Sequence, residues 1–371
     1  MDDVNRLAAD PSPATRAGTA TKLALEFNSG RFSPAELRLA EQIFRAMVKD
    51  AEIRVREALS ANLKNNALVP HDIAVTLAKD IDSVAMPMLS FSEVLTPEDL
   101  VSIINSQQSV SKMEAIAGRK TVDASVADAL VERGSESVIV RLAANAGADI
   151  RESAMHRIVD RFPNSEAVQE PLIRRAVLPV TITERLVTQV ADHLRERLLA
   201  KHNISEDLAM DLVLQTRERA TAGLAMGVTD SGLSALVRQL GDNKRLSGSL
   251  VLRALCMGNI RFFEHAVAFL SGVPITNTRV LIHDSAGNGL KAVWAKAKLP
   301  AALYPAIRAA LDVVAQTEFD GRDLDAERYS RRIIERILTQ YESFGVEFDG
   351  EDLEYLLARV SKLPSSSLTL H

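Results

Sequence analysis

Apolar residues recur at steps of three and four along almost the whole chain, the spacing that places side chains on one face of an α-helix. Near the C-terminus two such stripes follow each other: Ile333, Ile337, Tyr341 and Phe344, then Leu353, Leu356, Leu357, Val360 and Leu363. No segment alternates with the period of two that is typical of a β-strand. The pattern therefore predicts an all-α fold.

Hydroxyl residues followed three positions later by an acid mark the starts of several predicted helices. Segments 33–36 (SPAE), 96–99 (TPED) and 181–184 (TITE) each allow the hydroxyl to accept from a first-turn N–H while the acid binds back to the cap residue. Short breaks such as 272–274 (GVP) separate the apolar stripes. This punctuation predicts helices of roughly ten to twenty residues joined by short turns.

A weak repeat runs through the first part of the chain. Segments ending at Arg16, Arg56 and Arg141 resemble one another, and the interval from Arg56 to Arg141 is about twice the interval from Arg16 to Arg56. One degenerate copy between the last two would give a period of about 40–47 residues, as in HEAT and armadillo pairs. Such arginines can bury their stems and bridge loop acids of their own or the next unit, which is a packing role. The sequence thus predicts a HEAT/armadillo-like α-solenoid of stacked helical pairs over residues 1–180.

Two stretches resemble a known family. Residues 54–104, which begin RVREALSANL, and residues 250–284, which begin LVLRALCMGN, are similar to bacterial proteins described only as a domain of unknown function. The similarity covers roughly residues 45–310. It implies an all-helical, HEAT-like fold and no established reaction, so it supplies no catalytic residues.

Three further sections follow the predicted repeats. Residues 181–229 read as a long helical hairpin, residues 230–317 as a second helical module, and residues 318–371 as a helical pair with a tail. Residues 318–354 contain 12 acidic and 5 basic side chains, a net charge of −7. We expect residues 318–363 to extend the array, either by docking on the preceding section or by forming a homo-oligomer with a second chain.

Net charge, cysteine content and the length of apolar stretches limit which classes of protein the chain can belong to. The net charge is −5, which does not favour the phosphate backbone of a nucleic acid as a partner. A single cysteine, Cys256, excludes an intramolecular disulfide and lies in an apolar run where core packing is expected. No stretch approaches the roughly 18 apolar residues of a membrane span, and the N-terminus does not read as a secretory leader. These features predict a cytoplasmic protein without a transmembrane segment.

Residues 241–294 carry the candidate chemistry. The loop 241–249 could cradle an anion at a helix N-terminus, and His283 and Asp284 end an apolar run before a glycine-rich turn. The alternative is a solvated connector followed by a helix stop, with Asp284 capping the next helix. His265, among phenylalanines, is interpreted as a packed core residue. The candidate ligand or partner residues are Lys244, Arg245, Arg253, His283, Asp284 and Trp294.

No arrangement of residues matches a catalytic, cofactor or metal site, so we expect none of the three. The predicted architecture favours a non-enzymatic scaffold or adaptor that binds a protein partner on an extended surface. The alternative is a sensor of a small, possibly nucleotide-like or otherwise anionic ligand, with its pocket in residues 241–294. A scaffold should show a groove across several repeats, whereas a sensor should show one enclosed polar pocket.

Overall fold

The computed structural model describes residues 12–106, 109–201, 206–284, 287–316, 332–333 and 336. These residues fold into helices with short connections and contain no β-strand, which confirms the predicted all-α class. The chain divides into two compact units, Met1–Leu178 and Pro179–His371. Each unit is described by itself.

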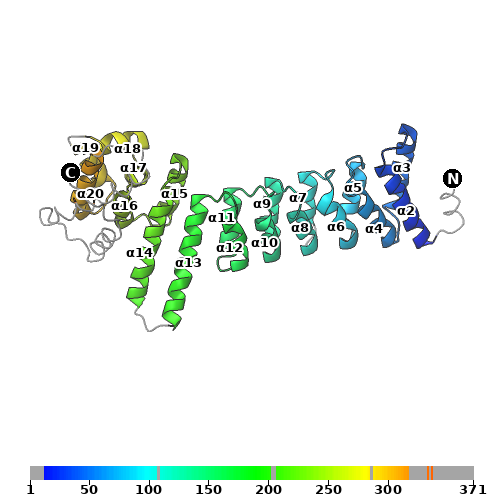
Figure 1. The fold of residues 1–371 in the computed structure, drawn as a ribbon, viewed down its shortest axis with the longest axis horizontal. Helices are drawn as coiled ribbons and strands as arrows, with labels where there is room; N and C mark the ends of the chain where they lie inside the picture. The colour runs from blue at the N-terminus through cyan, green and yellow to red at the C-terminus, as the bar shows by residue number, and fades with distance from the viewer. Residues whose placement is uncertain are drawn as a thin grey trace, which may run out of the picture. The chain divides into compact units, whose positions relative to one another are not determined.

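Unit 1 consists of short helices that follow one another as antiparallel neighbours (Figure 1). They are α2 (Pro13–Asn28), α3 (Pro34–Met47), α4 (Ile53–Leu63), α5 (His71–Ala78), α6 (Asp82–Phe91), α7 (Pro97–Ser106), α8 (Val110–Ala117), α9 (Ala124–Arg133), α10 (Glu136–Ala144), α11 (Glu152–Arg161) and α12 (Glu166–Ile173). From α5 onwards the helices of this unit are no longer than α6, so they lie at or below the lower end of the expected range.

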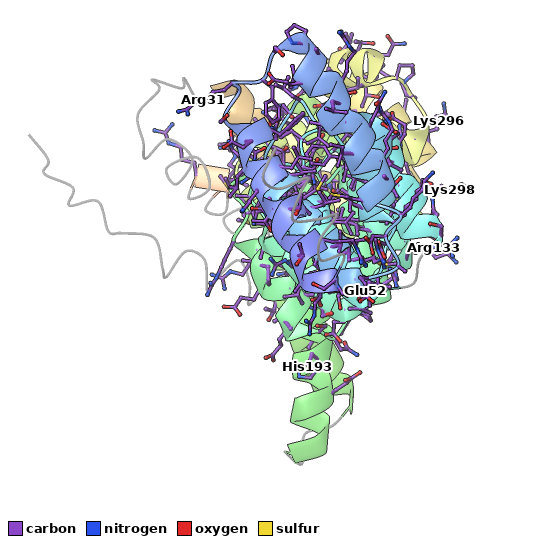
Figure 2. All side chains as sticks on the ribbon, turned by 90° about the vertical axis from the view of Figure 1, so that its right-hand side faces the viewer. Arg31, Glu52, Arg133, His193, Lys296 and Lys298 are labelled. Carbon is purple, nitrogen blue, oxygen red and sulfur yellow. The ribbon has the colours of Figure 1, made fainter. Side chains whose placement is uncertain are left out.

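Contacts between the helices of unit 1 define two layers. Each even-numbered helix packs against the next even-numbered helix, from α2 through α12, and α7, α9 and α11 pack against each other in the same order. Apolar side chains such as Leu59, Met88 and Leu142 are fully buried between the layers. Charged side chains such as Glu52 and Arg133 project into solvent (Figure 2). Neighbouring helices therefore stack one repeat on the next.

Two of the three predicted capping boxes form. The Ser33 hydroxyl accepts from the first turn of α3 while Glu36 binds back to the cap, and segment 96–99 does the same at α7. The third prediction is wrong. Helix α13 already begins at Val180, before the predicted cap, and the carboxylate of Glu184 binds side chains of α15 and of the loop that follows it.

Polar side chains that follow α8, α10 and α12 donate to carbonyls at or just after the end of the preceding even-numbered helix. Arg119 donates to the carbonyls of Leu89, 2.7 Å away, and Ser92, also 2.7 Å away, at the end of α6. Asn145 donates to the carbonyls of Ala117 and Arg119 at the end of α8. Arg175 donates to the carbonyls of Ala143, Asn145 and Ala148 after α10. These bonds satisfy carbonyls that a helix end leaves open, and they join each repeat to the next.

The repeat is shorter than the sequence spacing predicted. Helices α4, α6, α8, α10 and α12 start at Ile53, Asp82, Val110, Glu136 and Glu166. Because α6 and α8 both lie between Arg56 and Arg141, these two arginines are three repeats apart instead of two. The predicted period of about 40–47 residues is therefore wrong for this part of the chain.

The three repeat arginines do not share one role. Arg16 pairs with Asp50 at 2.8 Å and Arg56 with Asp80 at 2.5 Å, each reaching the loop acid of a neighbouring repeat, as predicted. Arg141 instead is exposed and lies over Gly118 of α8, where an added Cβ would be 2.5 Å from its Nε. Its place in a short repeat, on the solvent side of α10, keeps it away from a loop acid.

Unit 2 combines a long hairpin with shorter helices around α17. Its elements are α13 (Val180–Lys201), α14 (Glu206–Leu224), α15 (Asp230–Asp242), α16 (Gly248–Cys256), α17 (Ile260–Ser271), α18 (Ile275–Ile282), α19 (Asn288–Lys296), the 3₁₀ turn η1 (Ala301–Leu303) and α20 (Tyr304–Gln316) (Figure 1). Helix α17 contacts α15, α16, α18 and α19, and its residues 262–268 are all buried. Residues 181–229 and 230–317 thus contribute to one unit.

Ile333 is one of the few described residues of the C-terminal section. It is 0% exposed and belongs to the apolar core of unit 2. The other residues of its stripe, and the second stripe at 353–363, lie outside the described residues. Burial of Ile333 favours docking on the preceding section as the place where this stripe is covered.

Arg119→Met tests the capping bonds between repeats. The change keeps the apolar stem but removes the donors to the buried carbonyls of Leu89 and Ser92, so the folded chain should lose about 2 kcal/mol. Arg141→Ala is the matched control and should cost less than about 0.5 kcal/mol, because its guanidinium is exposed. Calorimetric melting of both variants checks this, and equal losses would contradict the assignment.

Cys256 provides an internal probe of unit 2. Its side chain lies in the unit 2 core and the residue is 1% exposed. A thiol reagent should therefore react only when unit 2 opens, with a rate that rises through the unfolding transition in urea. Rapid labelling in the absence of denaturant would show that this core is not closed.

Candidate functional site

The structure places the six predicted site residues in unit 2 but not in one pocket. Arg245 and Arg253 bind carboxylates of the α13–α14 hairpin, whereas His283 binds a carboxylate of α17. Asp284 accepts from the N–H of Gly289 at 3.1 Å, close to the start of α19. The ligand pocket predicted across residues 241–294 is thus divided into separate polar clusters.

The side chain of Trp294 packs inside unit 2. It is buried, its indole N–H donates to the carbonyl of Pro300 at 3.1 Å, and its ring meets Tyr304 edge to face with centroids 6.4 Å apart. A buried tryptophan requires such a partner for its N–H. Trp294 therefore packs α19 against the start of α20 and is not available to a ligand.

The first cluster surrounds Glu218 of α14. Its carboxylate accepts from Ser247 at 2.6 Å and Ser249 at 3.0 Å, and it pairs with Arg253 of α16 at 3.1 Å. The side chains of Arg253 and Glu218 are only 5% and 7% exposed. A buried ion pair with this many hydrogen bonds fixes the position of α16 against the hairpin, because breaking it leaves an uncompensated charge.

A second buried carboxylate lies beside the first. Glu184 of α13 pairs with Arg245 at 2.6 Å and accepts from Gln239 at 2.8 Å. Burial lowers the pKa of Arg245, although the adjacent Glu184 carboxylate opposes that shift. Between these pairs is a cavity of about 120 Å³, lined by α14 and by the loop that carries Lys244 and Arg245.

A third cluster joins the start of α15 to α17 and α18. Asp230 accepts from Arg261 at 2.9 Å and Arg279 at 3.0 Å. Glu264 accepts from Arg279 at 2.7 Å and binds His283 at 2.8 Å. Hydrogen bonds from Arg261 and Arg279 lower the pKa of Asp230 from 3.8 to about 2. His283 is thus part of an ion-pair network that connects three helices.

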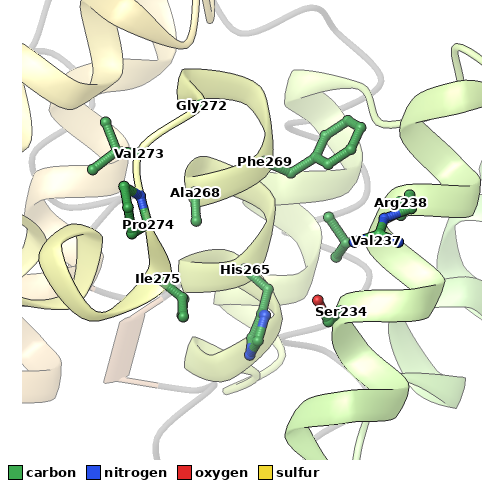
Figure 3. A pocket seen from close by; sticks show the side chains of 10 residues that line it. All are labelled: Ser234, Val237, Arg238, His265, Ala268, Phe269, Gly272, Val273, Pro274 and Ile275. Atoms are coloured by element: carbon green, nitrogen blue, oxygen red, sulfur yellow. The ribbon is translucent and has the colours of Figure 1, made fainter.

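An open groove of about 450 Å³ crosses the exposed side of α17 (Figure 3). Side chains of α15 and the segment 272–275 line it together with α17, and its lining is apolar except for Ser234, Arg238 and His265. His265 is 8% exposed, and its buried Nε2 makes no hydrogen bond to any described residue. Burial lowers the pKa of His265, so its imidazole is neutral at neutral pH.

The groove on α17 was missed by the sequence interpretation. Burial of His265 agrees with its prediction as a packed residue, but its ring also lines the groove (Figure 3). The exposed Arg238 belongs to another helix, and nothing in its sequence neighbourhood indicates this position. The groove has apolar walls and one cation, Arg238. Such a lining suits a ligand that places an apolar side chain beside an acidic group.

Unit 1 carries a second open groove, of about 520 Å³, between α8 and α10. Glu114 and Ser137, which are hydrogen-bonded at 2.6 Å, line it together with Arg141 and Asn145.

This groove forms part of the exposed side of the even-numbered helices, which we term the even-helix face. On each even-numbered helix from α4 to α12, the residues of this face recur at steps of three or four. In order along the chain they are 54, 58 and 61; 83, 87 and 90; 111, 114 and 118; 137, 141 and 144; 167, 171 and 174. Most of these side chains are Ala, Ser, Gly or Pro.

Among the described residues, no group of three or more His, Cys, Asp or Glu side chains is placed to hold a metal ion. Within the same residues, no helix is both long enough and apolar enough to span a bilayer.

Comparison with protein families gives one match. Residues 84–347, well over half of the chain, match the DUF2336 family, described as an uncharacterised protein conserved in bacteria. The chain belongs to this family. The match begins later and ends later than the resemblance over residues 45–310, and it includes parts of both units. No curated protein and no solved structure matched this DUF2336 protein.

Asp230→Asn tests the third cluster through its pH dependence. Because the folded-state pKa of Asp230 lies at about 2, below the ordinary 3.8, its ion pairs stabilise the fold above pH 4 and are lost as the pH falls toward 2. The variant should therefore have a lower Tm at neutral pH, and the difference should shrink on acidification. Asp242→Asn, an exposed change on the same helix, is the control. A difference that does not vary with pH would contradict the pairing.

Proposed function

We propose that this DUF2336 protein is a non-enzymatic adaptor of the bacterial cytoplasm. In this proposal unit 1 is a HEAT-like α-solenoid whose even-helix face binds a protein partner. The observation that carries the proposal is the recurrence of one packing arrangement from α4 to α12, with an exposed face of small side chains on one layer.

The repeated packing supports the solenoid. Each repeat contacts its neighbours through the even-numbered helices, and residues such as Arg119 and Asn145 cap the preceding repeat. An array in which each unit contacts only its neighbours grows into an extended surface instead of one central core. Because its helices are short, this repeat is a compact variant of the paired-helix arrangement.

The even-helix face supports a protein partner. Its small side chains let a helix or an extended segment approach the backbone closely, as in helix-in-groove recognition. The groove between α8 and α10 adds a cation at Arg141 and a carboxylate at Glu114, which can fix the register of a bound segment. This mixture of charges does not favour a polyanion such as nucleic acid.

A homo-oligomer through residues 318–363 is the other partner arrangement considered. Burial of Ile333 in the core of unit 2 disfavours it for the first stripe of that section. A different protein on unit 1 is therefore the better-supported partner.

Site-specific photo-crosslinking in the native bacterium tests the proposal. A crosslinking residue at Ser137 or Ala144, both exposed on α10, should capture one recurrent protein partner. The same residue at Glu132 or Arg133, exposed at the end of α9, should capture it at least about tenfold less, because these positions belong to the other layer.

A blocking variant makes this test sharper. Ala144→Trp fills the groove and should abolish capture from Ser137 without lowering the Tm, since the position is exposed. Arg133→Trp is the matched control and should leave capture intact. Equal capture from both layers, or capture that survives Ala144→Trp, would refute binding on the even-helix face.

A further inference from the structure

The cavity of about 120 Å³ in unit 2 concentrates positive charge. Arg217 of α14 lines it together with Lys244 and Arg245 of the α15–α16 loop. Glu218, Thr221 and Ser247 complete its polar lining. A volume of about 120 Å³ is well above the roughly 10–15 Å³ that one water needs, so the cavity has room for a small polyatomic group.

The carboxylates near the cavity are already bound by other groups. Glu184 is held by Arg245 and Gln239, and Glu218 by Ser247, Ser249 and Arg253. Among the described residues, the carboxylate that pairs with Arg217 is that of Asp192, which is half exposed and 3.9 Å away. Lys244 forms no ion pair with any residue that the structure describes. Of the cavity cations, Lys244 therefore has no counter-charge among the described residues, and Arg217 has a long and partly exposed ion pair.

Arg245 is not fully hydrogen-bonded in this arrangement. Its Nε is buried and makes no hydrogen bond within the described part of the chain. Burial lowers the pKa of Arg245, the Glu184 carboxylate opposes this shift, and the positive charge of Arg217 adds to it. An anion in the cavity would accept from Arg245 and offset the repulsion between the two guanidinium groups.

The backbone places Lys244 at this cavity in an unusual conformation. Helix α15 ends with the N–H of Arg245 bound to the carbonyl of Leu240 at 2.7 Å, and Lys244 between them has a φ of 57°. Where a helix ends in this left-handed conformation, glycine is the usual residue because it has no Cβ. Here the position carries a cationic side chain at the mouth of a cavity already lined by two arginines.

We infer that this cavity binds a phosphate group, held by Arg217, Lys244 and Arg245, with the hydroxyl of Thr221 as a further hydrogen-bond donor. A tetrahedral dianion matches three cations arranged around a small cavity, and guanidinium groups bind phosphate oxygens in pairs. The Glu218 carboxylate faces the same cavity, but its ion pair with Arg253 offsets its charge. The site needs neither His283 nor Asp284, which belong to other clusters, and it does not depend on partner binding by unit 1.

Isothermal titration of the full chain with inorganic phosphate, at constant ionic strength and neutral pH, tests the site. We expect saturable binding, and Lys244→Gln should raise the Kd about tenfold or more because one charge-assisted hydrogen bond is lost. Lys298→Gln is the matched control, since Lys298 is also exposed and has a φ of 55° after a helix. It should change the Kd less than about twofold.

A second titration distinguishes the source of the phosphate. Glycerol phosphate binding as tightly as inorganic phosphate would assign the site to the phosphate group of a larger molecule, whereas binding of inorganic phosphate alone would assign it to the free ion. Arg217→Gln should weaken both, and an unchanged Tm without phosphate would show that each variant is folded. Absence of saturable binding, or equal weakening by Lys244→Gln and Lys298→Gln, would overturn the inference.

Discussion

Capping of helix ends by the following repeat is the interaction on which unit 1 depends. A short helix leaves about four carbonyls at its C-terminal end without intrahelical donors, a large share of its backbone groups. Arg119, Asn145 and Arg175 donate to these carbonyls from one repeat further along the chain. Each helix end is therefore completed only when its neighbour is in place, which couples the repeats and sets their spacing.

In unit 2, buried ion pairs hold neighbouring elements together. Three largely buried carboxylates, Glu184, Glu218 and Glu264, each bind basic side chains from a neighbouring element and hold it in position. Such pairs offset the loss of hydration only when their hydrogen bonds are complete. Around the small cavity the cations outnumber the carboxylates available to them, and this imbalance is the physical basis for an anion site.

The two proposals for this DUF2336 protein rest on separate units. The even-helix face offers close approach and mixed polar groups, which suit a polypeptide segment, whereas the cavity in unit 2 is small and cationic, which suits a small anion. The family match extends from α6 of unit 1 into the C-terminal section of unit 2, so parts of both belong to the shared region.

Local chemistry in the sequence determined the helices. The steps of three and four predicted an all-α chain, and the capping pairs at 33–36 and 96–99 form, because both depend on residues within one or two turns. Tertiary structure alone decided what lies a whole repeat or more away: that Arg56 and Arg141 are three repeats apart, that Glu184 binds Arg245 instead of capping α13, and that Arg217 meets Lys244 at one cavity. Stacking selects such partners, and no local pattern encodes the register with which one helix packs on the next.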